Sequence, residues 1–160
     1  MIKITEKLFT EIAAKAGKAE RKRCNYNFHE DNSDPINRMI NVMERSAYFP
    51  PHKHEDPDKR EVFIILEGRV VMVEYDDSGN ITDHIVLDPK EGSFGVELGP
   101  RTWHNLIPLD EVSVLYEIKD GPYDKEVDKT FAGWAPREGE EGAEGFVKSI
   151  LGQLGLNSKL

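Results

Sequence analysis

The sequence has almost no cysteine, no long apolar run and no excess of basic residues, and each absence narrows what the protein can be. Cys24 is the only cysteine, so the chain cannot form an internal disulfide. No window approaches the ~18 apolar residues of a membrane-spanning helix. The N-terminal residues alternate Lys and Glu with apolar side chains, unlike a signal peptide. The net charge of −9 argues against nucleic acid or an anionic membrane as partner. We therefore expect a cytoplasmic protein that binds neither.

The remaining composition is typical of an ordinary globular protein. Hydrophobic residues make up 38% of the 160 residues and charged residues 32%. This length suffices for one domain with a substantial core. We predict a single domain in three parts, with an N-terminal helix and arm at 1–35, a β-barrel core at 36–118 and a C-terminal extension at 119–160.

Short strands dominate the predicted secondary structure. A long strand is predicted for 36–48, although a helix is also possible there, and it would place Arg38 on the same face as Ile36 and Ile40. Apolar runs separated by turn residues predict further strands at 61–67, 69–75, 81–87, 94–98, 102–107 and 112–118. This even spacing favours a sandwich or barrel over βαβ units.

Helices are predicted only near the two ends. Thr5 can cap a helix whose apolar residues recur at helical spacing until Gly17. Phe146, Ile150 and Leu154 indicate a short amphipathic helix that follows an acidic, glycine-rich segment at 139–145, which we expect to be a mobile linker. The basic segment 18–23 is either a solvated connector or a clamp for an anionic ligand or an acidic neighbour.

A cluster of potential metal ligands is the main functional signal. His52 and His54 are two residues apart after Pro50-Pro51, and on an extended strand they point to the same face. Glu61 opens the apolar run 62–66, and His104 follows a Gly-Pro turn. Three neutral imidazoles and one carboxylate are familiar ligands of a divalent transition metal. We predict that His52, His54, Glu61 and His104 form such a site.

The strand 61–67 supports a ligand role for Glu61. Both of its faces are otherwise apolar, so we expect it to be covered on both sides. A buried carboxylate is costly unless it is paired or bound to a cation. This cost favours a metal ligand over a glutamate that is exposed at a strand end.

Other polar residues allow two interpretations each. Arg38 is a candidate for binding an anionic substrate, or it forms an ion pair with an acidic side chain. Tyr48 is a candidate substrate-binding hydroxyl, or an aromatic ring packed at the barrel mouth. His29 is either solvated or a neighbour of the site. His84 has no partner at ligand spacing, and we expect it at the surface or the edge of a cavity.

The metal motif resembles a known superfamily. The pattern His52-x-His54-x6-Glu61-x6-Gly68, with a second block that ends in Trp103-His104, resembles the two sequence blocks of cupins. The gap before Glu61 is longer than usual, and Asp56-Pro57-Asp58 can bulge as a loop within it. The resemblance implies a mainly β fold, the cupin double-stranded β-helix or jelly-roll barrel, with short N- and C-terminal helices.

A second resemblance covers more of the chain and is more specific. The segments that carry it are Arg21-Lys22-Arg23, Asn27-Phe28-His29, Asn37-Arg38-Met39, Gly121-Pro122-Tyr123 and Trp134-Ala135-Pro136-x-Glu138. Together they resemble the WbuC family of cupin-fold metalloproteins. This resemblance implies a bound metal and suggests a link to surface-polysaccharide (O-antigen, lipopolysaccharide) biosynthesis, but it does not supply a reaction.

The predicted ligands allow several functions. Four ligands would complete a tetrahedral zinc site, whereas octahedral iron, manganese or nickel would keep about two positions open. We predict a metal-dependent enzyme that acts on a polar small molecule such as a sugar or nucleotide sugar, either as an isomerase or epimerase or as an iron-dependent dioxygenase. The alternative is a non-catalytic module that binds metal or sugar. The metal and the catalytic residues stay unassigned. We also expect a homodimer, since cupin sheets commonly pair through edge strands.

Overall fold

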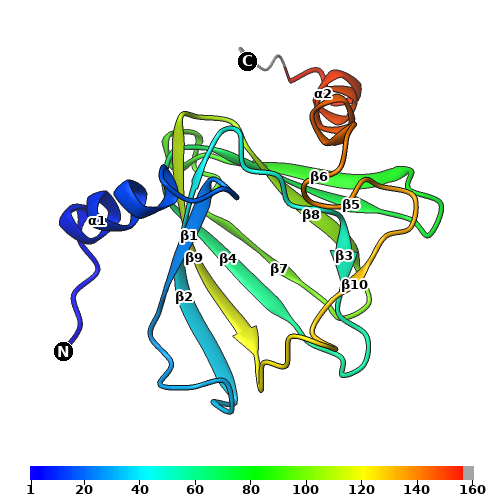
Figure 1. The fold of residues 1–160 in the computed structure, drawn as a ribbon. Helices are drawn as coiled ribbons and strands as arrows, with labels where there is room; N and C mark the ends of the chain where they lie inside the picture. The colour runs from blue at the N-terminus through cyan, green and yellow to red at the C-terminus, as the bar shows by residue number, and fades with distance from the viewer. Residues whose placement is uncertain (157–160) are drawn as a thin grey trace.

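Two five-stranded antiparallel sheets face each other in the computed structural model, which describes residues 1–156 (Figure 1). The strand order is β1-β2-β9-β4-β7 in the first sheet and β10-β3-β8-β5-β6 in the second. The elements in chain order are α1 (Glu6–Ala16), β1 (Arg23–Asn27), β2 (Ile36–Glu44), β3 (His52–Lys53), β4 (Glu61–Glu67), β5 (Val70–Tyr75), β6 (Ile81–Leu87), the 3-10 turn η1 (Pro89–Glu91), β7 (Gly95–Leu98), β8 (Trp103–Pro108), β9 (Val112–Asp120), β10 (Thr130–Phe131) and α2 (Ala143–Gln153). The mainly β fold with two short helices is as predicted. Residues 157–160 of the predicted C-terminal extension lie outside the described residues.

The predicted strands and helices agree closely with the structure. The six strands predicted between 61 and 118 correspond to β4 to β9, and their ends differ by two residues or fewer. The Thr5 side chain accepts a hydrogen bond from the backbone N–H of Leu8 and caps α1, which ends before Gly17. Gly68 turns the chain between β4 and β5 with φ +71°, and a Cβ there would lie 2.5 Å from the Val112 carbonyl oxygen.

Three predictions about individual segments were wrong. No strand was predicted within the N-terminal arm, but β1 lies there and pairs with β2 from Arg23↔Met43 to Asn27↔Met39. Backbone pairing at a sheet edge does not need an apolar strand, which is why its polar sequence hid it. The long strand predicted for 36–48 ends at Glu44, where the chain turns and the Ala47 N–H donates to the Glu44 carbonyl. The segment 139–145 is not all linker, because α2 begins at Ala143.

Apolar side chains fill one end of the space between the sheets. The central cluster consists of Met43, Ala47, Phe63, Ile65, Val70, Met72, Leu87, Leu98, Leu106 and Leu115. The two helices pack outside: α1 places Ile12 against Ile40 and Val42, and α2 places Ile150 and Leu151 among apolar side chains that include Val71, Val73 and Ile107. Burial of these side chains is the main stabilising contribution to the fold. The other end of the space between the sheets is polar and contains the site described below.

The outer face of β4 is less covered than predicted. Ile64 and Leu66 are each 37% exposed, and the neighbouring Phe94 is 59% exposed. The reason is the position of α1, which contacts β1 and β2 but does not extend over β4 (Figure 1). Two apolar side chains, Ile64 and Leu66, therefore share one open surface on the first sheet.

Within residues 1–156, neither helix has the length and apolar character that a membrane crossing requires.

Candidate metal centre

The four predicted ligands converge at one point between the sheets. One potential ligand atom from each of His52, His54, Glu61 and His104 lies within 4.8 Å of the others, and all four residues are buried. His52 in β3 pairs directly with His104 in β8, and His54 follows just after β3 ends, so two imidazoles come from the second sheet and the third from the loop next to it. Glu61 starts β4 of the first sheet. The site therefore joins the two sheets.

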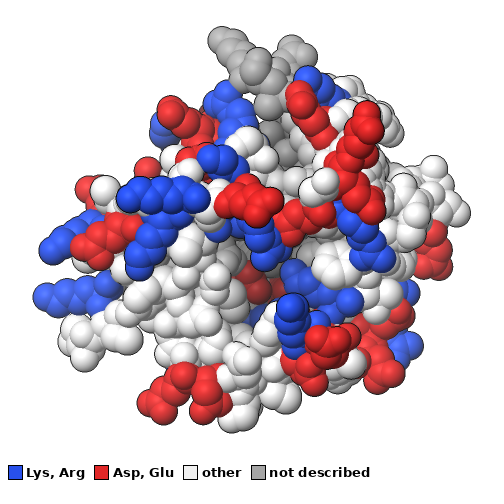
Figure 2. All heavy atoms as spheres, viewed as in Figure 1, with Lys and Arg blue, Asp and Glu red and all other residues white. Residues whose placement is uncertain are grey.

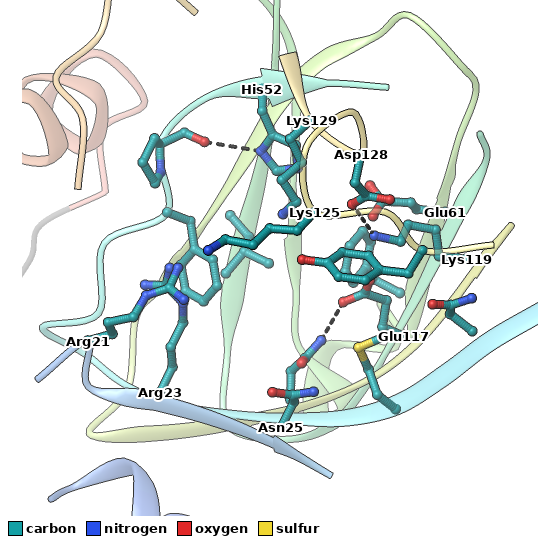
Figure 3. A pocket seen from close by; sticks show the side chains of 18 of the residues that line it. Arg21, Arg23, Asn25, His52, Glu61, Glu117, Lys119, Lys125, Asp128 and Lys129 are labelled. Carbon is teal, nitrogen blue, oxygen red and sulfur yellow. Dashed lines mark hydrogen bonds and ion pairs between the residues drawn. The ribbon is translucent and has the colours of Figure 1, made fainter. Parts of the chain in front are cut away.

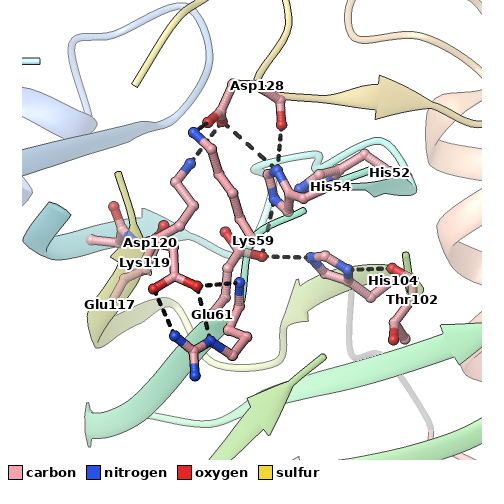
Figure 4. Close-up of polar contacts among 12 residues, drawn as sticks. His52, His54, Lys59, Glu61, Thr102, His104, Glu117, Lys119, Asp120 and Asp128 are labelled. Carbon is pink, nitrogen blue, oxygen red and sulfur yellow. Dashed lines mark hydrogen bonds and ion pairs between the residues drawn. The ribbon is translucent and has the colours of Figure 1, made fainter. Parts of the chain in front are cut away.

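Hydrogen bonds fix the orientation of all three imidazole rings. Nδ1 of His52 lies 3.1 Å from the Pro50 carbonyl oxygen, and Nδ1 of His104 lies 2.9 Å from that of Thr102. Nδ1 of His54 contacts the carbonyl oxygen of Asp128 (Figure 4). A carbonyl only accepts, so each Nδ1 carries the proton and donates it. Each neutral ring then presents the lone pair of Nε2 toward the centre.

The centre holds four buried acceptor atoms that face one another. Nε2 of His54 and of His104 lie 3.2 Å and 3.0 Å from Oε2 of Glu61. None of the three Nε2 atoms, nor Oε2 of Glu61, has a hydrogen-bond partner of acceptable geometry. Acceptors at this separation repel each other unless a cation lies between them. The residues therefore fit a bound metal ion.

The pKa directions agree with this interpretation. Burial lowers the pKa of His52 well below its ordinary value, helped by the positive charge of Lys129, so this ring is neutral and free to bind a metal. Burial opposes ionisation of Glu61, but Nε2–H donation and positive charge from His104 and His54 would outweigh that effect and hold its pKa well below the usual range, and a cation bound between the ligands acts in the same direction. Neutral imidazoles and an ionised carboxylate are the ligand states that a divalent transition metal needs.

A buried charge cluster holds His54 in place from behind. The Asp128 carboxylate lies 2.7 Å from Nζ of Lys59 and 2.7 Å from Nζ of Lys119, and all three residues are buried (Figure 4). The backbone carbonyl of the same Asp128 accepts the His54 proton. Sequence reasoning missed this cluster, because nothing in the local sequence indicates that either lysine is buried.

A cavity of about 670 Å³ leads from the surface to the metal ligands. His52, Glu61 and His104 line it together with Phe63 and Leu106. Strand alternation places Asn37, Met39 and Asn41 of β2 along one wall, whereas their neighbour Arg38 does not line the cavity. Figure 2 shows this face of the molecule, where basic side chains gather around a hollow with acidic atoms deeper inside.

The basic segment 18–23 meets an acidic neighbour, one of the two roles considered for it. Arg21 and Arg23 each place a guanidinium nitrogen 2.6 Å from the carboxylate of Glu138. All three residues line the cavity entrance, and Arg23 also stacks on the ring of Phe49 at 4.2 Å. The C-terminal extension is thereby tied to β1.

The structure does not place Arg38 or Tyr48 in the cavity wall. Arg38 forms an ion pair with Asp34 at 2.9 Å, the alternative considered from the sequence. The Tyr48 hydroxyl donates to the Pro136 carbonyl at 2.7 Å, and burial raises its pKa to about 12, so it remains a donor. Their roles in substrate binding stay predictions.

The other two histidines differ from each other. His29 is buried beside the cavity, where its Nδ1 accepts from the backbone N–H of Arg38 at 3.1 Å. His84 in β6 is exposed and outside the metal centre, as expected.

Sequence reasoning missed three cavity residues. Glu117 in β9 faces the cavity next to Asn41, and burial together with the negative charge of Glu61 raises its pKa. The only indication in the sequence was a polar residue at every second position near the end of an apolar strand, Glu117 and then Lys119, which suggests one polar face. Lys125 and Lys129 are exposed, as their sequence context indicates, but the sequence did not show that both line the cavity.

Comparisons with known proteins agree with the fold. The family model "Domain of unknown function (DUF6016)" matches residues 4–87, more than half of the chain. The comparison with curated proteins gives no match.

Similar solved structures include a cupin-2 domain protein from Rhodospirillum rubrum (TM-score 0.53, 13% identity, 81% of this chain and 80% of that one). The capsular polysaccharide assembling protein CapF from Staphylococcus aureus is also similar (TM-score 0.56, 18% identity, 67% and 28%), as is the DMSP lyase DddQ from Ruegeria pomeroyi DSS-3 (TM-score 0.52, 20% identity, 74% and 54%). The chain thus spans little more than a quarter of CapF and about half of DddQ. At these identities the similarities establish the fold alone, which is that of the cupins.

Proposed function

This chain belongs to the DUF6016 family and has the cupin fold, and we propose that it is a metal-dependent enzyme acting on a polar small molecule. The observation that carries the proposal is a group of four partnerless ligand atoms, of which those of His52, Glu61 and His104 belong to residues that line a cavity of about 670 Å³. A metal with a purely structural role would not need a cavity through which a small molecule can reach it. Cavities of this size are typical of small-molecule sites.

Different residues at this site would bind the metal, transfer a proton and exclude water. Nε2 of the three histidines and the carboxylate of Glu61 would hold the metal, which would act as a Lewis acid on a substrate oxygen. Glu117 faces the same cavity with a raised pKa, which suits a group that takes a proton from a substrate hydroxyl or returns one. Phe63 and Leu106 exclude water from the floor of the cavity.

The substrate class that we propose is a sugar or nucleotide sugar, in a cytoplasmic step of surface-polysaccharide biosynthesis. Asparagine side chains on one wall of the cavity support it, because amides both donate to and accept from hydroxyl groups. The resemblance of Trp134-Ala135-Pro136-x-Glu138 and the other segments to the WbuC family is a second support. The fold similarity to CapF, a capsular polysaccharide assembling protein, points in the same direction.

A substrate screen on metal-loaded protein tests the proposal. Protein loaded separately with iron(II), manganese(II), nickel(II) or zinc(II) would be incubated with a panel of sugars and nucleotide sugars. Products would be followed by NMR and oxygen uptake by electrode. Rearranged sugar without oxygen uptake identifies an isomerase or epimerase, and oxygen uptake identifies a dioxygenase. Binding of sugars with no turnover under any metal would contradict the enzyme and favour the non-catalytic module.

A further inference from the structure

The cavity wall is rich in basic residues although the chain as a whole is acidic. The net charge of the chain is −9. The cavity-lining side chains nevertheless include six basic residues, Arg21, Arg23, Lys119, Lys125, Lys129 and Arg137, against four acidic ones, Glu61, Glu117, Asp128 and Glu138. Glu61 would be neutralised by the metal. This local excess of positive charge needs an explanation.

We propose that the cavity binds an acidic, polyhydroxylated small molecule, a sugar phosphate or a sugar acid, with its acidic group on Lys125 and Lys129. The inference deepens the proposed function and rests on it, because it names the substrate class of the same site. Phosphate and carboxylate share the required chemistry, which is a compact oxyanion.

Three of the six basic side chains already have partners. Arg21 and Arg23 share the carboxylate of Glu138, and Lys119 is paired with Asp128. Among residues 1–156, by contrast, neither Lys125 nor Lys129 forms a hydrogen bond or an ion pair with another side chain. Both lysines are exposed to solvent, so both ammonium groups are available to an anion bound in the cavity.

Both lysines line the same cavity as three of the metal ligands, so they could contact a substrate that is bound to the metal. They belong to the segment between β9 and β10, and Figure 3 shows their side chains extending into the cavity, Lys129 beside His52 and Lys125 toward Arg21. Loss of hydration inside the cavity lowers the pKa of Lys129, and the negative charges of Glu61, Glu117 and Asp128 only partly counteract this. A lysine ammonium binds phosphate or carboxylate as a point charge and needs no fixed orientation.

The opposite wall is suited to the hydroxyl groups of the same ligand. Four asparagines on β1 and β2 line it, Asn25, Asn27, Asn37 and Asn41. Asn25 donates to Asn27, and Asn41 donates to Glu117, so each donor amide keeps a second N–H for a ligand. A volume of about 670 Å³ accommodates a monosaccharide with a charged substituent. Hydroxyls on one wall and an oxyanion on the other define the proposed ligand.

Calorimetric titration with three matched probes tests the inference. Purified protein would be titrated with glucose 1-phosphate, glucuronate and glucose, which differ in their acidic group. We expect at least one anion to bind about tenfold or more tightly than glucose, because charge-assisted hydrogen bonds are stronger than neutral ones. Tighter binding of the phosphate assigns a sugar phosphate, and tighter binding of glucuronate assigns a sugar acid. Added sodium chloride should weaken the binding of the anion but not of glucose.

Paired lysine variants supply the control. Lys125→Gln with Lys129→Gln should weaken anion binding about tenfold or more and leave glucose binding unchanged. Lys18→Gln with Lys90→Gln removes the same charge from exposed positions outside the cavity and should leave both affinities within about twofold. Equal binding of glucose and the anions, no binding of either anion, or equal losses in the two double variants would overturn the inference.

Metal content of the same samples separates the two proposals. Lysine-dependent anion binding in protein that takes up no metal would refute the enzyme and leave the inference standing. Protein that binds metal but shows no preference for anions would refute the inference about the ligand and leave the proposed metal-dependent enzyme standing. Thermal unfolding confirms that the variants are folded, and the salt dependence of the unsubstituted protein gives a test that needs no variant.

Discussion

The backbone carbonyl of Asp128 accepts a hydrogen bond from Nδ1 of His54, although the two residues are 74 positions apart in the chain. The Asp128 carboxylate is at the same time held between Lys59 and Lys119. The predicted metal ligand His54 is thus oriented by the segment that follows β9. Such partners of a ligating histidine commonly set metal affinity.

We predict that Asp128→Asn weakens metal binding about 10-fold: it keeps the backbone carbonyl that orients His54 but removes the charge that holds this segment between Lys59 and Lys119. It should also destabilise the fold by about 3 kcal/mol, because Lys59 and Lys119 would lose their buried counter-charge. Metal titration and urea unfolding measure the two effects. Asp120→Asn is the matched control, since Asp120 pairs with Arg60 at the surface. Equal metal affinity of the two variants would refute the role of Asp128.

His54→Ala and His104→Ala should each lower metal affinity by more than the ~10–100-fold typical of a lost neighbouring partner, because each removes a ligand atom. His84→Ala removes an exposed imidazole and should leave metal content unchanged, with a stability change of no more than about 0.5 kcal/mol. Metal analysis of the three purified variants measures this. If all three lost metal equally, the assignment of the ligands would be wrong.

The link between Arg21, Arg23 and Glu138 should make stability depend on pH. Burial alone would raise the pKa of Glu138, but hydrogen bonds and charge from Arg21 and Arg23 outweigh it and lower the pKa. The folded-state pKa is therefore below the unfolded value of roughly 4.3, so the stabilisation is present above that pH and is lost as pH falls through the folded pKa.

We therefore expect Glu138→Gln to cost about 1 kcal/mol of unfolding free energy near pH 7. The difference from the unsubstituted protein should shrink progressively below about pH 4.3. Urea unfolding at a series of pH values measures it. A difference that stays constant down to pH 3 would contradict the assigned pKa direction.

The open surface of Ile64 and Leu66 on β4 is where we expect the predicted homodimer to form. Each of these side chains is 37% exposed, and a second copy of the chain would cover them. Leu66→Lys should shift the protein from dimer to monomer at micromolar concentration in sedimentation experiments. Ile85→Lys, on the other sheet and 38% exposed, should not. A monomeric unsubstituted protein would refute the dimer.

The sequence predicted most of the barrel and the four ligands because their signals are local. Apolar runs separated by Gly, Pro and Asp place β4 to β9, and the spacing of His52 and His54 is set by strand alternation. The turn that brings His104 opposite His52 follows from the Gly-Pro pair before it.

Features that depend on contacts between distant segments were not predictable in this way. The edge strand β1 is polar and exists because β2 offers it a hydrogen-bonding partner. The burial of Lys59 and Lys119 depends on the return of Asp128 after β9, and no local pattern encodes it. The exposed outer face of β4 depends on how far α1 extends over the first sheet. In each case tertiary packing determined the outcome.

The metal content of the purified protein tests the account most directly. Elemental analysis should find close to one divalent transition metal per chain, because three imidazoles and Glu61 present partnerless lone pairs to one point. Chelator treatment should remove the metal and lower the thermal stability, and reconstitution should restore both. Protein that contains no such metal and takes none up on reconstitution, with its stability unchanged, would contradict the central claim.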